Sequence, residues 1–145
     1  MSTWKQRRDP LFRGDGEGGV QLPTPGADPS VVRHILYLDG PGRPTPYVST
    51  TESRDVAEGF AKGGRVYQTR VPDWAPHGVV HLSRKELLSN LRGVGKGRAR
   101  WPSAQQVMTA RRYVEEAAEH LADFSGVVSE DLRGVVDAVF PPGRR

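Results

Sequence analysis

The chain has 145 residues and no cysteine, which fits one domain and excludes disulfide scaffolds, cysteine nucleophiles and cysteine-ligated zinc. Lysine and arginine outnumber aspartate and glutamate by 21 to 17, which allows an anionic partner but does not establish one. No apolar run approaches the roughly 18 residues of a membrane span, and no apolar stretch follows the charged N-terminus as in a secretory signal.

Turn-forming residues dominate the first third of the chain. The 17 glycines and 12 prolines favour many turns and argue against a helical bundle. Residues 1–9 are polar and are expected to form a loose tail. Leu11 and Phe12 form a short apolar pair that runs into a turn, and a long Gly- and Pro-rich loop covers 14–30. The apolar run at 31–38 is compatible with a helix or a strand, and 39–46 is another turn.

The middle of the chain alternates strand and helix signals. Residues 47–51 are aromatic and β-branched and predict a strand. Thr51 or Ser53 can cap a helix that ends at the glycine pair 63–64, and the alternating pattern at 65–71 predicts a half-buried strand. A short strand is expected near 79–80, and a capping box at 83–86 opens a helix that continues to Leu91.

The last third begins with a basic loop at 92–102 and continues into a helix that starts near Pro102. The segments 127–128, 132–136 and 139–140 are interpreted as strand ends. No repeat or shift in composition marks a second domain. We therefore expect one α+β domain over 10–141, followed by a basic tail at 142–145.

Two segments, taken in order, carry a resemblance to a known family. The first is Leu-Phe-Arg-Gly-Asp at 11–15, and the second is Tyr-Val-Ser-Thr-Thr at 47–51, which leads into a helix containing Phe60 and Ala61. A glutamate, Glu119, lies before a late segment that ends near 136. This order resembles the ADP-ribosyltransferase toxins of the arginine–serine–glutamate class, the cholera-toxin-like group. The match consists of these anchoring motifs, and residues 72–110 have no counterpart in it.

The resemblance implies a fold and a site. The implied fold packs two small β-sheets, antiparallel or mixed, between flanking helices and encloses a cleft for NAD. The implied catalytic residues are Arg13, Ser49 and Glu119, and Gly14, Thr50 and Thr51 join Arg13 and Ser49 in holding NAD. The stretch from Glu119 to 136 would supply the closing strand, turn and final strand. No metal is implied.

These residue types suit the chemistry of NAD. A guanidinium makes forked hydrogen bonds to phosphate oxygens, so Arg13 suits the pyrophosphate. Gly14 would let the backbone approach a ligand closely. The Ser49 hydroxyl can bond both a ribose and a carboxylate. Loss of nicotinamide passes through an oxocarbenium-like state, which a carboxylate such as Glu119 would stabilise.

The sequence departs from the family at one position that bears on the acceptor. Family members often carry Glu or Gln two residues before the catalytic glutamate, where this chain has Ala117. Modification of arginine side chains is therefore disfavoured. Glu116 is the alternative catalytic carboxylate if the family motif aligns with this chain in a shifted register. A second alternative extends the helix through 104–121, which would make Glu119 an ordinary surface residue.

Three other features were weighed as sites. His77 and His81 are four residues apart, which would suit zinc on a helix, but the sequence between them favours a strand. The glycine-rich segment 93–97 lacks the spacing of a phosphate loop. Six cations and no acid lie between Glu86 and Glu115, and with Trp101 they would suit DNA or RNA. Alternatively, the six cations form a solvated surface, and the acidic residues later in the chain balance their charge.

Taken together, the sequence predicts a mono-ADP-ribosyltransferase toxin or effector domain with NAD as substrate and a protein or a nucleic acid as acceptor. A closely related alternative is an NAD glycohydrolase. An alternative of a different functional class is a non-enzymatic basic module that binds nucleic acid. The resemblance also implies a monomer without a membrane span, delivered into a target-cell cytoplasm, with an immunity protein as a partner.

Overall fold

The computed structural model describes residues 9–15, 20–38 and 44–141. The predicted basic tail at 142–145 and residues 1–8 of the predicted N-terminal tail lie outside the described residues. The same holds for residues 16–19 and 39–43, which belong to the two Gly- and Pro-rich segments. Among the described residues, no helix has the length and apolar character needed to cross a membrane.

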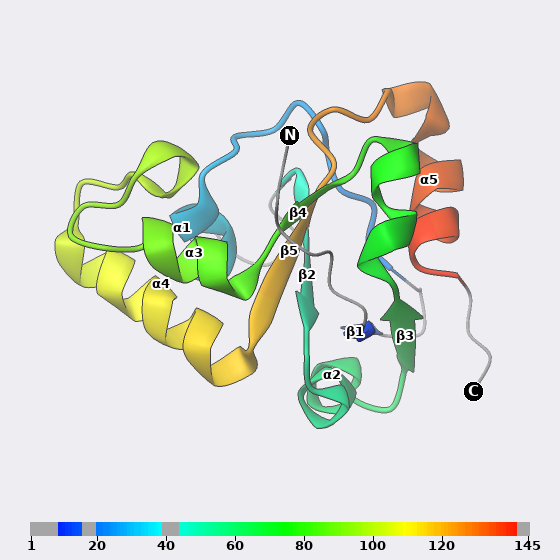
Figure 1. Cartoon of the computed structure of the whole chain (residues 1–145), viewed down its shortest axis with the longest axis horizontal. Helices are drawn as coiled ribbons and strands as arrows, with labels where there is room; N and C mark the ends of the chain where they lie inside the picture. The colour runs from blue at the N-terminus through cyan, green and yellow to red at the C-terminus, as the bar shows by residue number, and fades with distance from the viewer. Residues whose placement is uncertain (1–8, 16–19, 39–43, 142–145) are drawn as a thin grey trace.

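One antiparallel sheet of five strands forms the centre of the described chain (Figure 1), in the order β3-β1-β2-β5-β4. The strands are β1 (Leu11–Asp15), β2 (Tyr47–Thr51), β3 (Arg65–Thr69), β4 (Val80–Leu82) and β5 (Glu119–Asp123). The predicted α+β class is confirmed. The described residues form one sheet, however, where two packed sheets were expected.

The strands β1 and β2 are only weakly paired, and we call the boundary between them the seam. These strands share a single paired position, Phe12 with Thr51, whereas β1 pairs with β3 and β2 pairs with β5 at five positions each. Beyond that position, Arg13 bridges the two strands with its side chain, because Nη1 donates to the Ser49 carbonyl over 3.1 Å. The seam therefore divides the sheet into a β3-β1 part and a β2-β5-β4 part.

In the part of the chain that the structure describes, five α-helices flank the sheet, and serine caps begin four of them. They are α1 (Val31–Ile35), α2 (Arg54–Ala61), α3 (Arg84–Asn90), α4 (Ala104–Ala117) and α5 (Leu132–Val139). Single turns of 3-10 helix occur at η1 (Val71–Asp73), η2 (Ala75–His77), η3 (Gly97–Ala99) and η4 (Ser129–Asp131). The hydroxyls of Ser53 and Ser83 accept backbone N–H groups at the starts of α2 and α3, so both predicted helices have the expected type of cap.

The C-terminal interpretation as strands is wrong. The chain forms η4 and then α5, drawn in red in Figure 1 on the opposite side of the sheet from α4. Leu132, Val135, Val136 and Val139 recur at i, i+3, i+4 and i+7, and this spacing places all four on one helix face. That face packs against the sheet, so the valines belong to a helical stripe rather than to strand ends.

Two hydrophobic cores lie on the two faces of the sheet. Side chains alternate along β2, so Tyr47 joins the core under α1, α3 and α4, while Val48 joins the core under α5. The same alternation divides β5, where Leu121 faces the first core and Ala122 the second. Ser49 and Glu119 follow the parity of Tyr47 and Leu121, so both face the side that carries α1 and α4.

Candidate active site

A pocket of about 650 Å³ opens at the seam, where β1 and β2 separate, and α2 and the C-terminal turn of α4 complete its walls. A smaller pocket of about 160 Å³ adjoins it and shares four lining residues with it: Arg13, His34, Tyr37 and Ser49. The predicted residues Gly14, Thr50, Thr51 and Glu119 also line the larger pocket. The fold thus brings every predicted site residue to one place.

Glu119 is the first residue of β5 and lies at a sharp junction. The helix α4 ends at Ala117, and Ala118 takes a left-handed conformation (φ 47°) that turns the chain into the strand. The predicted alternative of a helix through 104–121 is therefore excluded. Only 9% of Glu119 is exposed, and its Oε2 accepts a hydrogen bond of 2.7 Å from the Ser49 hydroxyl.

The surroundings of Glu119 raise the pKa of its carboxyl to about 7. Burial is the main cause, because it removes the water that would stabilise the anion. The hydrogen bond from Ser49 and the positive charge of Arg13 act in the opposite direction and offset part of the effect. A carboxyl with such a pKa is only partly ionised at neutral pH, and a strongly shifted, buried carboxyl in a pocket is typical of a functional site.

Arg13 is fixed from two sides. Its Nε and Nη2 atoms donate to the two oxygens of Asp15 over 2.7 and 2.9 Å, and Nη1 donates to the Ser49 carbonyl. A guanidinium has five N–H groups, so this arrangement leaves two of them for a ligand. Because Arg13 lines both pockets, those donors can reach an anionic group at the boundary between them.

His34 also contacts the site, although sequence reasoning did not single it out. Its Nε2 lies 2.7 Å from the Ser49 hydroxyl, and its Nδ1 lies 3.0 Å from the hydroxyl of Thr45. Ser49 has one hydroxyl proton, which it gives to Glu119, so it accepts from His34 Nε2–H. Had the run 31–38 been assigned as a helix, His34 would have stood out as a titratable residue beside its apolar face.

Gly14, Thr50 and Thr51 hold the elements around the pocket together. A Cβ on Gly14 would lie 1.8 Å from the Ala57 carbonyl oxygen, so the approach of α2 alone requires glycine here. The hydroxyls of Thr50 and Thr51 donate to the carbonyls of His120 and Ala117, over 3.0 and 2.5 Å. These threonines therefore tie β2 to the start of β5.

Glu116 and three aromatic residues lie at the edge of the pocket. Glu116 is exposed on the last turn of α4 and lines the pocket, but the carboxylate that Ser49 contacts is that of Glu119. Tyr37, Phe60 and Tyr113 line the same pocket and are 45–59% exposed. Tyr37 takes a left-handed backbone conformation (φ 53°), which is rare for an aromatic residue and costs on the order of 1–3 kcal/mol.

The basic stretch is only partly available for a ligand. Arg98 pairs with the buried Asp123 over 2.6 Å, and Arg111 donates to the Leu88 carbonyl. Trp101 is half-buried and lies under the guanidinium of Arg33, 5.7 Å from the ring centroid. Arg98 is itself exposed, and the other exposed cations of the stretch are Arg92, Lys96, Arg100 and Arg112. They lie on the loop before α4 and along α4 itself, and the pocket meets α4 at its C-terminal end.

The two histidines weighed for zinc lie on different elements. His77 is exposed on η2, whereas His81 is on β4 and contacts His120. Among the residues that the structure describes, no group of three or more potential ligands is placed to hold a metal ion.

No family model, no curated protein and no solved structure matches this chain. The site is therefore interpreted from its own geometry.

Proposed function

We propose that this protein cleaves NAD between nicotinamide and ribose and transfers the ADP-ribose to a macromolecular acceptor. One observation carries the proposal. Arg13, Ser49 and Glu119 come from three strands and meet in one pocket. Ser49 joins the other two, because its hydroxyl contacts Glu119 and its carbonyl contacts Arg13.

The shape of the site supports a dinucleotide substrate. The two adjoining pockets share Arg13, so a pyrophosphate at this boundary would leave one half of NAD on each side of it. The larger pocket is of a size that suits a small-molecule ligand. In this proposal the β3-β1 and β2-β5-β4 parts of the sheet correspond to the two sheets of an ADP-ribosyltransferase, and the pocket at the seam is the NAD cleft.

Glu119 acts in its ionised form. The bond that breaks joins ribose C1′ to the nicotinamide nitrogen, and its electron pair stays with nicotinamide, which leaves as a neutral molecule. Positive charge develops on the ribose, and a buried carboxylate beside it stabilises that charge strongly because little water screens the interaction. The nicotinamide ring of NAD is cationic, and beside Glu119 it would lower the pKa of the carboxyl, so NAD binding itself would favour the ionised form.

The acceptor completes the reaction. Its nucleophilic atom forms a bond to C1′ and loses its proton to solvent. The acceptor is a protein or a nucleic acid, and a glycohydrolase differs only in that water takes its place. A non-enzymatic nucleic-acid-binding protein would leave the arrangement at the seam without a use. We further propose that the protein acts as a monomeric effector in the cytoplasm of a target cell, where an immunity protein could block the pocket.

The test is release of nicotinamide from NAD, followed by chromatography. The wild type releases nicotinamide, Glu119→Ala abolishes release, and Glu115→Ala, one turn away on α4, retains it. Glu116→Ala decides between the two carboxylates, and we expect it to retain cleavage of NAD. If the wild type neither binds NAD nor releases nicotinamide under any condition, the proposal is wrong. Labelled NAD in a cell lysate, with nuclease or protease treatment afterwards, identifies the class of acceptor.

A further inference from the structure

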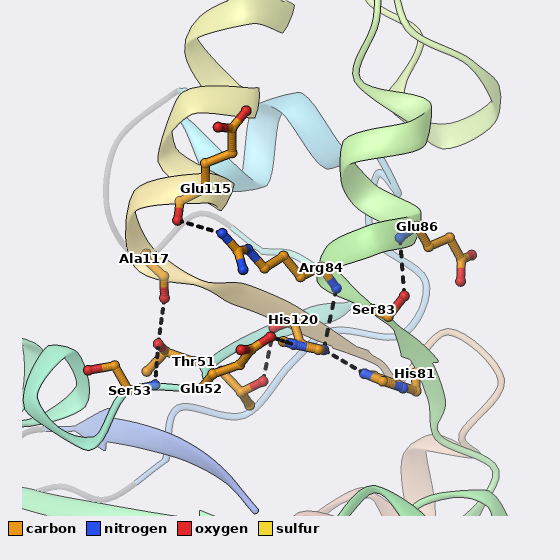
Figure 2. A network of polar contacts seen from close by, with 11 residues as sticks. Thr51, Glu52, Ser53, His81, Ser83, Arg84, Glu86, Glu115, Ala117 and His120 are labelled. Atoms are coloured by element: carbon orange, nitrogen blue, oxygen red, sulfur yellow. Dashed lines mark hydrogen bonds and ion pairs between the residues drawn. The ribbon is translucent and has the colours of Figure 1, made fainter. Parts of the chain in front are cut away.

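Side chains alternate along β5, so His120 lies on the opposite face of the sheet from Glu119, and it belongs to a second polar network (Figure 2). It runs across three strands, from Glu52 at the end of β2 through His120 on β5 to His81 on β4. His120 Nε2 lies 2.7 Å from Glu52 Oε2, and His120 Nδ1 lies 2.8 Å from His81 Nε2. His120 is buried, whereas Glu52 and His81 are half-buried, so the centre of the network is shielded from solvent and its two ends are partly exposed.

The protons of this network have one consistent arrangement. The backbone N–H of Arg84 also points at His120 Nδ1, at 3.3 Å, and a backbone amide can only donate. Nδ1 therefore carries a lone pair and accepts from both Arg84 and His81. The ring proton of His120 is on Nε2 and is donated to Glu52. The two imidazole rings are nearly parallel, at 8°, with centroids 5.0 Å apart, which fits an edge-to-edge N–H···N bond.

The network adds to a set of bonds around the backbone of Glu119. The Ala118 carbonyl accepts from the Glu52 N–H over 3.1 Å, and the flanking carbonyls of Ala117 and His120 accept from the two threonines of β2. Residues on both sides of Glu119 are thus tied to the end of the strand that carries Ser49. Of the contacts that the His120 ring makes with Glu52, His81 and the Arg84 backbone, the one to Glu52 reaches the end of the strand that holds Ser49.

We propose that His120 is a positioning residue whose bond to Glu52 holds Glu119 in hydrogen-bond register with Ser49. This inference rests on the proposed function for its effect on catalysis. The contacts to His81 and Arg84 anchor the ring from β4 and α3, which carry none of Arg13, Ser49 and Glu119. The two halves of the network therefore differ in what they do for the site, although both stabilise the fold.

Two substitutions separate these halves. In His120→Gln the amide nitrogen takes the place of Nε2 and keeps the bond to Glu52. In His120→Asn the amide oxygen takes the place of Nδ1 and keeps the bonds from His81 and Arg84. Each variant loses one half of the network and part of the ring, so we expect similar losses of thermal stability. His77→Asn replaces an exposed histidine outside the network and serves as the matched control.

The expected result is a difference in kcat without a matching difference in stability. His120→Asn lowers kcat for nicotinamide release by about tenfold or more, with KM for NAD nearly unchanged. The reason is that loss of the bond to Glu52 lets the Glu119 carboxylate move away from its position beside Ser49. His120→Gln stays within about threefold of the wild type, and His77→Asn behaves as the wild type. Equal losses of kcat in the Gln and Asn variants, or a loss confined to KM, would overturn the inference.

A measurement without NAD separates this inference from the proposed function. The Glu119 carboxyl is titrated by carbon-13 NMR in the wild type and in both variants. In His120→Asn the carboxyl turns toward water, and its midpoint falls from about 7 toward the ordinary value of 4.5, whereas His120→Gln keeps the raised midpoint. If the wild type releases no nicotinamide, the proposed function fails and this titration still decides the positioning role. An unchanged midpoint in His120→Asn overturns that role.

Discussion

Ser49 donates its hydroxyl proton to Oε2 of Glu119 over 2.7 Å, and the two residues are 70 positions apart in the chain. The bond offsets part of the rise in the pKa of Glu119 that burial causes. Ser49 therefore does more than occupy the pocket wall, because it helps to set the pH at which the carboxyl ionises.

The first prediction concerns the pH dependence of NAD cleavage. In the proposed function the ionised form of Glu119 is the active one, so we expect kcat/KM for nicotinamide release to rise with pH and to level off above an apparent pKa of about 7. Ser49→Ala removes the hydrogen bond, so this apparent pKa moves upward and the loss of activity is larger at pH 6 than at pH 9. A pH–rate series measures both effects. Ser89→Ala, at an exposed position of α3, is the control. A uniform loss across the pH range would contradict the role of Ser49.

The second prediction concerns stability. The folded protein binds a proton at Glu119 more tightly than the unfolded chain does, so the free energy of unfolding falls as pH rises from 4.5 through 7. Glu119→Gln removes this titration and raises the free energy of unfolding at pH 8 by up to about 3 kcal/mol. The gain disappears below pH 4.5. Urea unfolding at several pH values tests this, and Glu116→Gln, which changes an exposed carboxyl, should show no such dependence. A gain that does not depend on pH would contradict the explanation.

The third prediction compares two glycines at α2. Gly14→Ala places a Cβ against the Ala57 carbonyl, so α2 has to move and the protein loses about 1–3 kcal/mol of stability. Gly59→Ala lies on α2 itself with nothing within 4 Å of the added Cβ, and it gains up to about 1 kcal/mol from better helix propensity. Thermal unfolding measures both. Tolerance of alanine at position 14 would show that α2 does not pack as described.

The fourth prediction separates structural from exposed arginines in the basic stretch. Arg98→Ala leaves the buried carboxylate of Asp123 without its cation, although Ser125 still donates to it, and costs about 1–2 kcal/mol because Arg98 is half-exposed. Arg100→Ala changes stability by less than about 0.5 kcal/mol. If a nucleic acid is the acceptor, Arg100→Ala also weakens the salt dependence of its binding. Equal effects on stability would contradict the assigned role of Arg98.

Much of the middle of the fold could be predicted from local patterns. The alternation at 65–71 and the serine caps of α2 and α3 are short-range signals, and the structure confirms the elements they predict. The strand prediction for α5 followed from its valines, two of which are adjacent, because valine favours strands by propensity. The spacing of the apolar residues favours a helix, which buries Val136 and Val139 and partly buries Leu132 and Val135 on one face.

The candidate site could be predicted only in part. Motif order indicated Arg13, Ser49 and Glu119, because these positions match a resemblance that the sequence carries. His34 and His120 have no such motif, and their importance depends on which strand and helix lie beside them in space. The sharp turn at Ala118, which starts β5 at Glu119, uses a left-handed alanine. Alanine gives no sequence signal for that conformation, so the sequence could not decide whether the helix ends before Glu119 or continues to residue 121.

The single paired position between β1 and β2 has a consequence for when the protein can act. Arg13 lies on one side of that seam, and Ser49 and Glu119 lie on the other, so neither part of the sheet holds a complete site. Completion of the site therefore depends on the docking of β1 against β2, which is the step that brings Arg13 to Ser49 and Glu119. If the proposed function is right, a chain in which β1 has not docked cannot cleave NAD, so activity would appear only when folding is complete.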